Sequence, residues 1–496
     1  MRRATPLAAD PSTPPVVHAR RWTADAAAIV LVLAALQVVF FGALFAAQAV
    51  PDDPIVDHVQ EAIDSGLYGP VPRPDLMGGK SSAHSECVIA GTGLGRPDMS
   101  VFERTVRMPR ISSCKNGDED IAMLDRGSPA RGVTSYFRYW GGYTVLTRPI
   151  LAIWGWEGLR MAFGGLLVVS AAVAAVAVVR ATRPVYAIGL ALPMVFGSNL
   201  LSTPSSSFGL SLSYAVALLS LALTAFGARA GLARCALGAA VGAALFNYFT
   251  QLTTPAVPWM WSAAVAGAVV ACRSGSVARA ARAVAVVGVV WPLAFAGTWA
   301  ARWATSAVFL GWDETSSGVR DKVDLRLGGT APIVELSFGA STNRNLEYWL
   351  ETYPLVPAVL FGSVLAILGC LVVGVRRYGR GRLGTFAVLA APAVITPLWY
   401  EALRNHSQVH APFVYANLPA ALGVVLAAAW LTTVPLERVP PTAPDDDGAS
   451  VDLNGDRDGE GGNDGDGDDD RLVAAGLVST AAPTLGRASS QTSTSC

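Results

Sequence analysis

Ten hydrophobic segments, each near the length that crosses a bilayer as a helix, follow one another through residues 26–435 of this 496-residue chain. They cover residues 26–50, 161–179, 185–201, 208–226, 232–249, 256–271, 283–305, 355–375, 383–399 and 413–434. Only 15% of the residues are charged, against about a quarter in a typical soluble domain. The pattern therefore predicts an all-α integral membrane protein with about ten transmembrane helices. The segments at 185–201 and 256–271 are short and contain or border proline, so either could be tilted, broken or partly re-entrant.

The distribution of arginine predicts how these helices are oriented. The loops expected in the cytoplasm hold Arg180, Arg183, Arg229, Arg234, Arg273, Arg279, Arg282, Arg376, Arg377, Arg380 and Arg382. The opposite short turns, 202–207 and 251–255, contain no lysine or arginine, so the positive-inside rule places both termini in the cytoplasm. We expect a multi-pass protein of the cell membrane, and the zero net charge gives no reason to expect a nucleic-acid partner.

The domain organisation follows from these spans. A cytoplasmic segment at 1–25 precedes a membrane domain at 26–435, whose large extracytoplasmic loops cover about 51–160 and 306–354. In these loops we expect a helix in the membrane interface at 143–159, a short strand at 332–338 and a second interfacial helix at 345–353, with Tyr348, Trp349 and Tyr353 at headgroup level. Residues 436–496 are rich in Asp and Gly and predict a disordered acidic cytoplasmic tail.

The N-terminus has two readings. Ala47-Gln48-Ala49 has the small-x-small form of a signal-peptidase site after a basic region and an apolar stretch. That stretch is longer than the usual apolar core of a signal peptide, about 7–15 residues, so an uncleaved first helix is the favoured interpretation.

Two aspartates, Asp52 and Asp53, stand at the outer end of the first span. Carboxylates at a membrane surface can act as a general base or bind a divalent ion, and these two could deprotonate an acceptor hydroxyl beside a lipid-linked donor. The alternative is that they simply mark where the helix leaves the bilayer.

A second cluster joins the last two spans on the outer side, at residues 399–410. Arg404, Asn405, His406 and His410 could hold a phosphate or pyrophosphate head group. His406 and His410 are four residues apart, as zinc ligands on a helix can be, but no glutamate lies between them and we predict no metal site there. An interfacial belt with incidental polar residues is the alternative.

Aromatic residues surround Arg138 in the first outer loop. Arg138, Tyr139 and Trp140 could stack on sugar rings, although the same residues would suit an interfacial belt. The same loop contains Cys87 and Cys114, for which we predict a disulfide, because the oxidising outer side permits one. Charge within the spans is nearly absent, Arg302 being the main exception, which argues against an ion-coupled carrier.

In these features the chain resembles polytopic glycosyltransferases of the GT-C type, which have many spans, a long first outer loop and an acidic pair after the first helix. The resemblance implies that Asp52 or Asp53 is the base or the metal-binding element. The strings at 138–143 and 405–415 also resemble those of uncharacterised bacterial multi-pass membrane proteins.

We therefore expect a glycosyltransferase that moves a sugar from a polyprenyl-phosphate donor to an envelope glycan or lipid outside the membrane. Its partners would be membrane lipids, the lipid-linked donor and the acceptor, and a divalent cation is the one cofactor considered. Arg404, Asn405, His406 and His410 would bind the phosphate, and Arg138 with its aromatic neighbours would line the acceptor. Two other classes stay open: a non-enzymatic transporter or flippase of a lipid-linked or amphipathic substrate, and an envelope assembly factor. The abundance of Ala, Val and Arg with few Lys indicates a high-GC bacterium.

Overall fold

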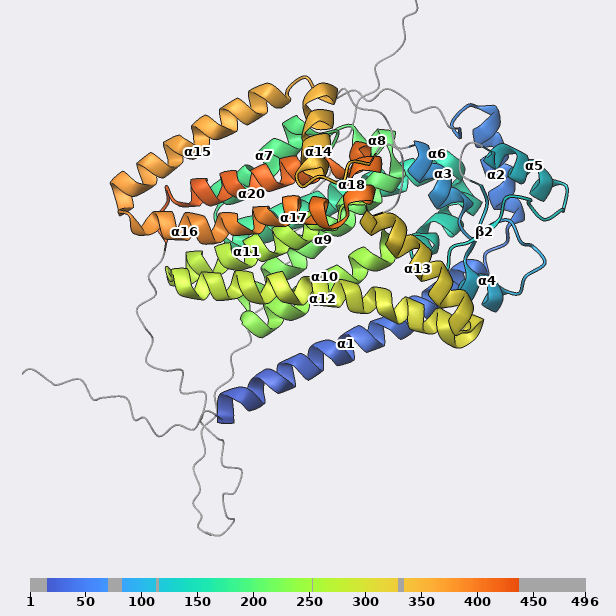
Figure 1. The fold of residues 1–496 in the computed structure, drawn as a ribbon, viewed down its shortest axis with the longest axis horizontal. Helices are drawn as coiled ribbons and strands as arrows, with labels where there is room; N and C mark the ends of the chain where they lie inside the picture. The colour runs from blue at the N-terminus through green and yellow to red at the C-terminus, as the bar shows by residue number, and fades with distance from the viewer. Residues whose placement is uncertain (1–15, 70–82, 113–115, 252, 329–333, 437–496) are drawn as a thin grey trace, which may run out of the picture. The chain divides into compact units, whose positions relative to one another are not determined.

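The computed structural model describes residues 16–69, 83–112, 116–251, 253–328 and 334–436, and nearly all their regular structure is helical (Figure 1). The first half contains α1 (Val16–Gln48), α2 (Asp53–Asp64), α3 (Ala83–Gly91), α4 (Val101–Arg107), β1 (Pro109–Arg110), α5 (Gly117–Asp125), β2 (Thr134–Ser135), α6 (Thr144–Ala181), α7 (Pro184–Gly197), α8 (Thr203–Ser206) and α9 (Phe208–Arg229). The second half contains α10 (Leu232–Phe249), α11 (Ala256–Ser274), α12 (Val277–Leu310), α13 (Trp312–Gly328), α14 (Ala340–Thr352), α15 (Val356–Tyr378), α16 (Gly381–Ala390), η1 (Ala391–Val394), α17 (Ile395–Ala402), α18 (Arg404–Val409), α19 (Ala411–Val414) and α20 (Asn417–Leu431). The predicted acidic tail lies outside the described residues, apart from 436.

Within the described residues, nine segments are long and apolar enough to cross a bilayer: α1, α6, α9, α10, α11, α12, α15, α16 to α17, and α19 to α20. They match nine of the ten predicted spans. The tenth, expected at 185–201, is the 14-residue helix α7, which is about 21 Å long and too short for a core of about 30 Å. It contains Pro193 and ends at Gly197, and the backbone of the next residue, Ser198, is extended. The prediction of ten full spans is therefore corrected to nine in the described part of the chain, with a short helix at the tenth position.

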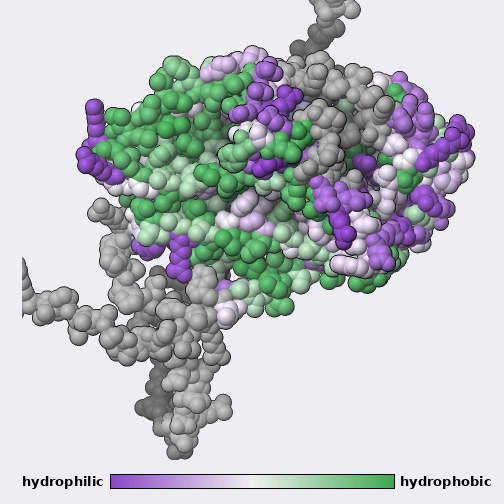
Figure 2. Space-filling model, viewed as in Figure 1, coloured by the Kyte–Doolittle hydropathy of each residue, from purple (hydrophilic) through white to green (hydrophobic). Residues whose placement is uncertain are grey.

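The outer surfaces of several helices are apolar, which is what a lipid environment requires. Only 11% of the residues in the most apolar windows of α1 and α15 are buried inside the protein. Large side chains such as Leu31, Val38 and Phe361 are more than two-thirds exposed. Figure 2 shows hydrophobic surface over the long helices and hydrophilic residues gathered at the end that carries α2, α4 and α5. In water such exposed apolar area would drive aggregation.

The first outer loop folds against the ends of the long helices, where α2, α3, α4 and α5 gather beside the beginning of α6 (Figure 1). β1 and β2 pair antiparallel, with Arg110 opposite Thr134. The interfacial helix expected at 143–159 is instead the first part of α6, which continues to Ala181. Gly155 breaks this helix with a φ of 64°, a backbone conformation that favours glycine.

The second outer loop differs from prediction in two places. Residues 334–338 contain no strand, and 332–333 lie outside the described residues, so the strand is not found where the chain is described. The helix predicted at 345–353 is confirmed as α14, but Trp349 and Tyr353 are buried in the protein rather than at headgroup level. Helix α13 was not predicted, since its sequence has little amphipathic pattern.

Candidate functional site

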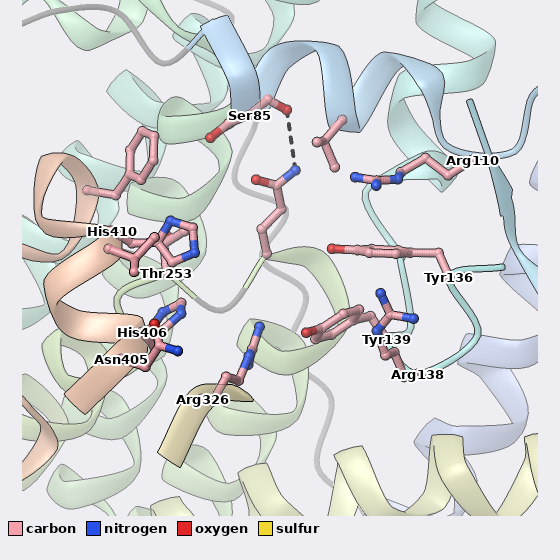
Figure 3. A pocket seen from close by; sticks show the side chains of 14 residues that line it. Ser85, Arg110, Tyr136, Arg138, Tyr139, Thr253, Arg326, Asn405, His406 and His410 are labelled. Carbon is pink, nitrogen blue, oxygen red and sulfur yellow. Dashed lines mark hydrogen bonds between the residues drawn. The ribbon is translucent and has the colours of Figure 1, made fainter. Parts of the chain in front are cut away.

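A cavity of about 400 Å³ lies where the first outer loop meets the turn between the last two spans (Figure 3). It is on the side expected to be extracytoplasmic. Elements far apart in the sequence contribute its lining: Ser85, Val88, Arg110, Tyr136, Arg138, Tyr139, Gln251, Thr253, Arg326, Asn405, His406, Val409, His410 and Phe413. In the described chain this lining has no carboxylate.

Three arginines on one side of the cavity stack against two tyrosines. The Tyr136 ring lies between Arg110 and Arg138, whose guanidinium carbons are 4.8 and 5.2 Å from its centroid. Arg138 and Arg326 likewise flank Tyr139, at 5.6 and 5.3 Å. The quadrupole of each ring attracts both cations, so the tyrosines hold together charges that would otherwise repel one another.

Within the described part of the chain these three guanidinium groups have no acidic partner. Among the described residues, no carboxylate oxygen lies within 4.0 Å of a guanidinium nitrogen of Arg110, Arg138 or Arg326. The Nε atoms of Arg110 and Arg138 are buried and have no hydrogen-bond partner among the described residues. Burial raises the pKa of Tyr136 to about 12, so its phenol stays neutral at physiological pH and supplies no compensating charge. The cavity is therefore suited to an anion.

Helix α12 fixes the segment that carries Arg138 and Tyr139. Three of its residues, Trp299, Arg302 and Trp303, donate hydrogen bonds to backbone carbonyls of this segment, and we call them the carbonyl clamp. Arg302 is fully buried and its Nε donates to the carbonyls of Phe137 and Tyr139, at 2.9 and 3.1 Å. The indole nitrogens of Trp299 and Trp303 both donate to the carbonyl of Arg138, at 2.8 and 3.0 Å. Helix α12 thereby binds three consecutive backbone carbonyls, and the side chains of Arg138 and Tyr139 are directed at the cavity.

Arg302 also reaches α4. Its second terminal nitrogen donates to the carbonyls of Thr105 and Val106, at 3.2 and 2.8 Å, and its guanidinium lies 5.4 Å from the centre of the Trp140 ring. A buried cation bound by backbone carbonyls and an aromatic ring needs no carboxylate to be stabilised.

The opposite wall of the cavity is α18, which carries His406, together with His410 directly after it. The His406 and His410 rings lie 4.7 Å apart. Burial, Arg326 and His410 hold the pKa of His406 well below its usual value, so this imidazole is neutral at physiological pH. His406 is 6% exposed, and its buried Nε2 has no hydrogen-bond partner in the part of the chain that the structure describes. In Figure 3 the hydroxyl ends of Tyr136 and Tyr139 point across the cavity toward this wall.

Neighbouring polar groups hold α18 in place. The Gln408 side chain exchanges two hydrogen bonds with the backbone of Glu335, at 2.7 and 2.9 Å, and Asn345 donates to the carbonyl of Ser407 at 3.0 Å. The carboxylate of Glu401 accepts from Gly339 at the start of α14. Arg404, predicted to bind phosphate, instead donates to the carbonyl of Leu336 at 2.7 Å and does not line the cavity.

The structure places the aspartate pair elsewhere. Asp52 bridges two arginines: its oxygens lie 2.8 Å from Arg104 and 2.5 Å from Arg148, whose side chain is 2% exposed. Asp53 is exposed at the start of α2. Neither lines the cavity, and a base or metal role for them stays a prediction. The described residues contain no group of three or more His, Cys, Asp or Glu placed to hold a metal ion.

The remaining predicted residues divide between the cavity and the core. The fold brings five of them together in the cavity lining: Arg138, Tyr139, Asn405, His406 and His410. Trp140 is buried, and its indole nitrogen donates to the carbonyl of Thr298 at 2.8 Å. Cys87 is disulfide-bonded, but Cys114 lies outside the described residues, so this pairing stays a prediction.

Sequence reasoning missed Arg110 and Arg326. Arg110 stands among many charged residues of a long loop, and Arg326 ends a helix of alternating charge; neither belongs to a motif. The available signal was indirect: neither arginine has a carboxylate three or four residues away along the chain, since Asp324 is only two residues from Arg326 and Lys322 is itself basic.

Comparison with protein-family models, curated proteins and solved structures gives no significant match. The class of the protein accordingly rests on its own fold. The length and composition of its helices, with their exposed apolar faces, make it a multi-pass integral membrane protein.

Proposed function

We propose that the cavity binds the phosphate-bearing head group of a lipid-linked substrate. The observation that carries this proposal is the set of three guanidinium groups, Arg110, Arg138 and Arg326, that share a cavity without a carboxylate partner in the described chain. Guanidinium groups make bidentate, charge-assisted bonds to phosphate oxygens, and partial burial strengthens them relative to water.

The activity that fits this head group best is sugar transfer from a polyprenyl-phosphate donor to an envelope acceptor on the extracytoplasmic side. In this reaction the bond between the anomeric carbon and the phosphate oxygen breaks, and the phosphate leaves with the electron pair. The three arginines would stabilise that developing negative charge, which is the interaction that lowers the barrier. The new bond joins the anomeric carbon to the acceptor oxygen.

The proton of the acceptor hydroxyl needs a base. We assign it to Nε2 of His406, because this imidazole is neutral, lines the cavity and has no hydrogen-bond partner there among the described residues. Asp52 already accepts from two arginines, so its carboxylate is a poorer candidate. Tyr139 and Asn405 would orient the sugar and the phosphate.

A second function is favoured by one observation. The cavity lining in the described chain lacks a carboxylate, so the one candidate base there is an imidazole whose pKa is held low. A flippase that only recognises and translocates the lipid-linked head group needs the arginines but no base.

The test uses the purified full-length protein in liposomes. With a short-chain polyprenyl-phosphate sugar and candidate envelope acceptors, we expect release of the polyprenyl phosphate, lost in Arg138→Gln and Arg326→Gln. Arg96→Gln is the matched control, because Arg96 pairs with Asp98 on the surface. A fluorescent lipid-linked sugar protected from an external quencher reports translocation. Translocation without sugar release would assign the flippase function, and neither activity would refute both.

A further inference from the structure

A second basic cavity, of about 440 Å³, lies at the opposite ends of the long helices. Its charges come from three helix C-termini: Arg180 of α6, Arg229 of α9 and Arg273 of α11. The Arg273 guanidinium donates to the carbonyl of Arg229, which fixes it over the end of α9. We call these residues the arginine cavity.

The arginine cavity carries an excess of positive charge. Each helix C-terminus contributes a partial charge of about −0.5, so three together offset about half of the three guanidinium charges. The lining contains no carboxylate, and none of the described carboxylates lies within ion-pair distance of Arg180, Arg229 or Arg273. An anion from outside the described chain would complete the site.

An apolar groove of about 450 Å³ is lined by the same three helices together with α7 and α8. Leu167, Ala171, Ala174 and Val178 line it from α6, at intervals of four, three and four residues, and Ala181 of the arginine cavity continues this spacing. Residues so spaced share one face of a helix, so the groove runs along α6 toward the arginine cavity. From Leu167 to Val178 the groove is about 16 Å long, and its far end reaches Pro204 of α8, in the turn expected on the opposite side. An acyl chain that starts at the arginine cavity can therefore extend along it.

Helix α9 gives the same alignment. Leu218 lines the groove and Arg229 lines the arginine cavity, eleven residues further on. Eleven residues are about three helical turns, so both side chains leave α9 in nearly the same direction.

We propose that the arginine cavity and the groove together bind one anionic phospholipid of the leaflet expected to be cytoplasmic. The lipid phosphate would contact Arg180, Arg229 and Arg273, and an acyl chain would fill the groove. Basic pockets between transmembrane helices on the cytoplasmic side recognise anionic lipids by this combination of charge and apolar contact. This site is independent of the function proposed for the outer cavity.

Charge alone would also suit the acidic segment at 445–470 or a free anion. The apolar groove distinguishes a phospholipid from these two alternatives. The segment consists mainly of Asp and Gly with few large apolar side chains, and inorganic phosphate has none, so neither could fill an apolar groove of this length. A phospholipid satisfies both parts of the site.

The experiment titrates the purified full-length protein in detergent and follows its thermal unfolding midpoint. We expect phosphatidylglycerol to raise the midpoint, and phosphatidylcholine or inorganic phosphate at equal concentration to leave it unchanged. Each arginine at an anionic lipid is worth roughly fivefold in affinity, so Arg180→Gln/Arg229→Gln/Arg273→Gln should weaken phosphatidylglycerol binding about 100-fold. The matched control is Arg376→Gln/Arg377→Gln/Arg380→Gln, which removes three cytoplasmic-side charges outside the cavity and should bind like the wild type.

A second pair of variants tests the groove without touching the charge. Ala171 is exposed within the groove, so Ala171→Phe should fill it and weaken phosphatidylglycerol binding. Ala172 is exposed on the same helix outside the groove, and Ala172→Phe should have no effect. The proposal is overturned if the triple arginine variant binds like the wild type. It is also overturned if Ala171→Phe matches Ala172→Phe, or if inorganic phosphate alone raises the midpoint, since the occupant would then not use the groove.

Discussion

The side of this protein expected to be extracytoplasmic holds two groups of charged residues that are built in opposite ways. Around Asp52, one carboxylate lies between Arg104 and Arg148, and Arg148 also donates to the carbonyls of Ala47, Gly93 and Val50. Around the cavity, three arginines stack on tyrosines and have no carboxylate among the described residues.

The difference indicates what each group does. The Asp52 bridge has a carboxylate bound by both of its arginines and ties the end of α1 to α4 and α6, so we expect its main contribution to be to stability. The cavity is electrostatically incomplete, and assembling three like charges costs free energy that folding alone does not recover. Perturbed and uncompensated charges in a cavity are the usual sign of a binding site.

The largest expected effect follows from removing Asp52. Asp52→Ala leaves the buried guanidinium of Arg148 without its carboxylate, and breaking a buried pair costs about 3–5 kcal/mol in the free energy of unfolding. We expect a much lower thermal unfolding midpoint and a low yield of purified protein. Asp53→Ala, on the exposed neighbour, should unfold like the wild type.

The opposite result would give Asp52 a different role. If Asp52→Ala unfolds like the wild type but abolishes sugar transfer, the bridge is dispensable for stability. That result would favour Asp52 as the catalytic base. Asp52→Asn sharpens the distinction, because it keeps the size of the side chain and removes the charge.

The carbonyl clamp gives the next largest effect. Arg302→Lys keeps the positive charge but cannot reach four carbonyls on two segments, so several stay unsatisfied. We expect a loss of about 2–4 kcal/mol in the free energy of unfolding. Because the clamp positions Arg138 and Tyr139, pyrophosphate affinity should fall as well, measured by calorimetry on the fraction that stays folded. Unchanged affinity in that fraction would show that Arg302 serves stability alone.

Removing a cavity arginine should lower the affinity for pyrophosphate without lowering the stability of the fold. Arg138→Ala or Arg326→Ala should weaken pyrophosphate binding about 10–100-fold, the value of one charge-assisted hydrogen bond, with the unfolding midpoint unchanged or raised by the reduced repulsion. Arg104→Ala is the contrasting variant, because Arg104 pairs with Asp52 and should cost stability with little direct effect on binding. A lowered unfolding midpoint in Arg138→Ala, with unchanged pyrophosphate affinity, would show that Arg138 serves stability rather than binding.

Local sequence was enough for the spans and for part of the cavity. Apolar runs of membrane-crossing length located nine helices, and only the Pro193-containing segment fell short. Arg138, Tyr139, Asn405, His406 and His410 were identified because polar and aromatic residues crowd into short segments outside the spans. Such crowding exceeds what a turn needs and can be read without knowing the fold.

Contacts between residues distant in the sequence could not be predicted from local sequence patterns. Asp52 pairs with residues 52 and 96 positions away, and the Trp140 indole bonds a carbonyl 158 positions away. No periodicity encodes such pairings, so an ion-paired aspartate and a free one look alike in the sequence. Arg110 and Arg326 were missed for the same reason, since only the folded chain brings them beside Tyr136 and Tyr139.

The smallest expected effect concerns pH, and it tests the neutral state of His406. Its pKa in the folded protein is well below the usual value near 6.5, so below pH 6.5 the unfolded chain takes up a proton that the folded one does not. Folding should therefore weaken as the pH falls below about 6.5, by at most about 1.4 kcal/mol per pH unit, until the folded pKa is reached. In His406→Gln this part of the pH dependence should be absent, measured by denaturant unfolding between pH 7.5 and 5. A bound anion would favour the imidazolium, so added pyrophosphate should reduce the acid sensitivity of the wild type. If pyrophosphate binds but leaves the acid sensitivity of unfolding unchanged, His406 does not face the anion. The three arginines would then be the only groups that distinguish the cavity from the Asp52 bridge.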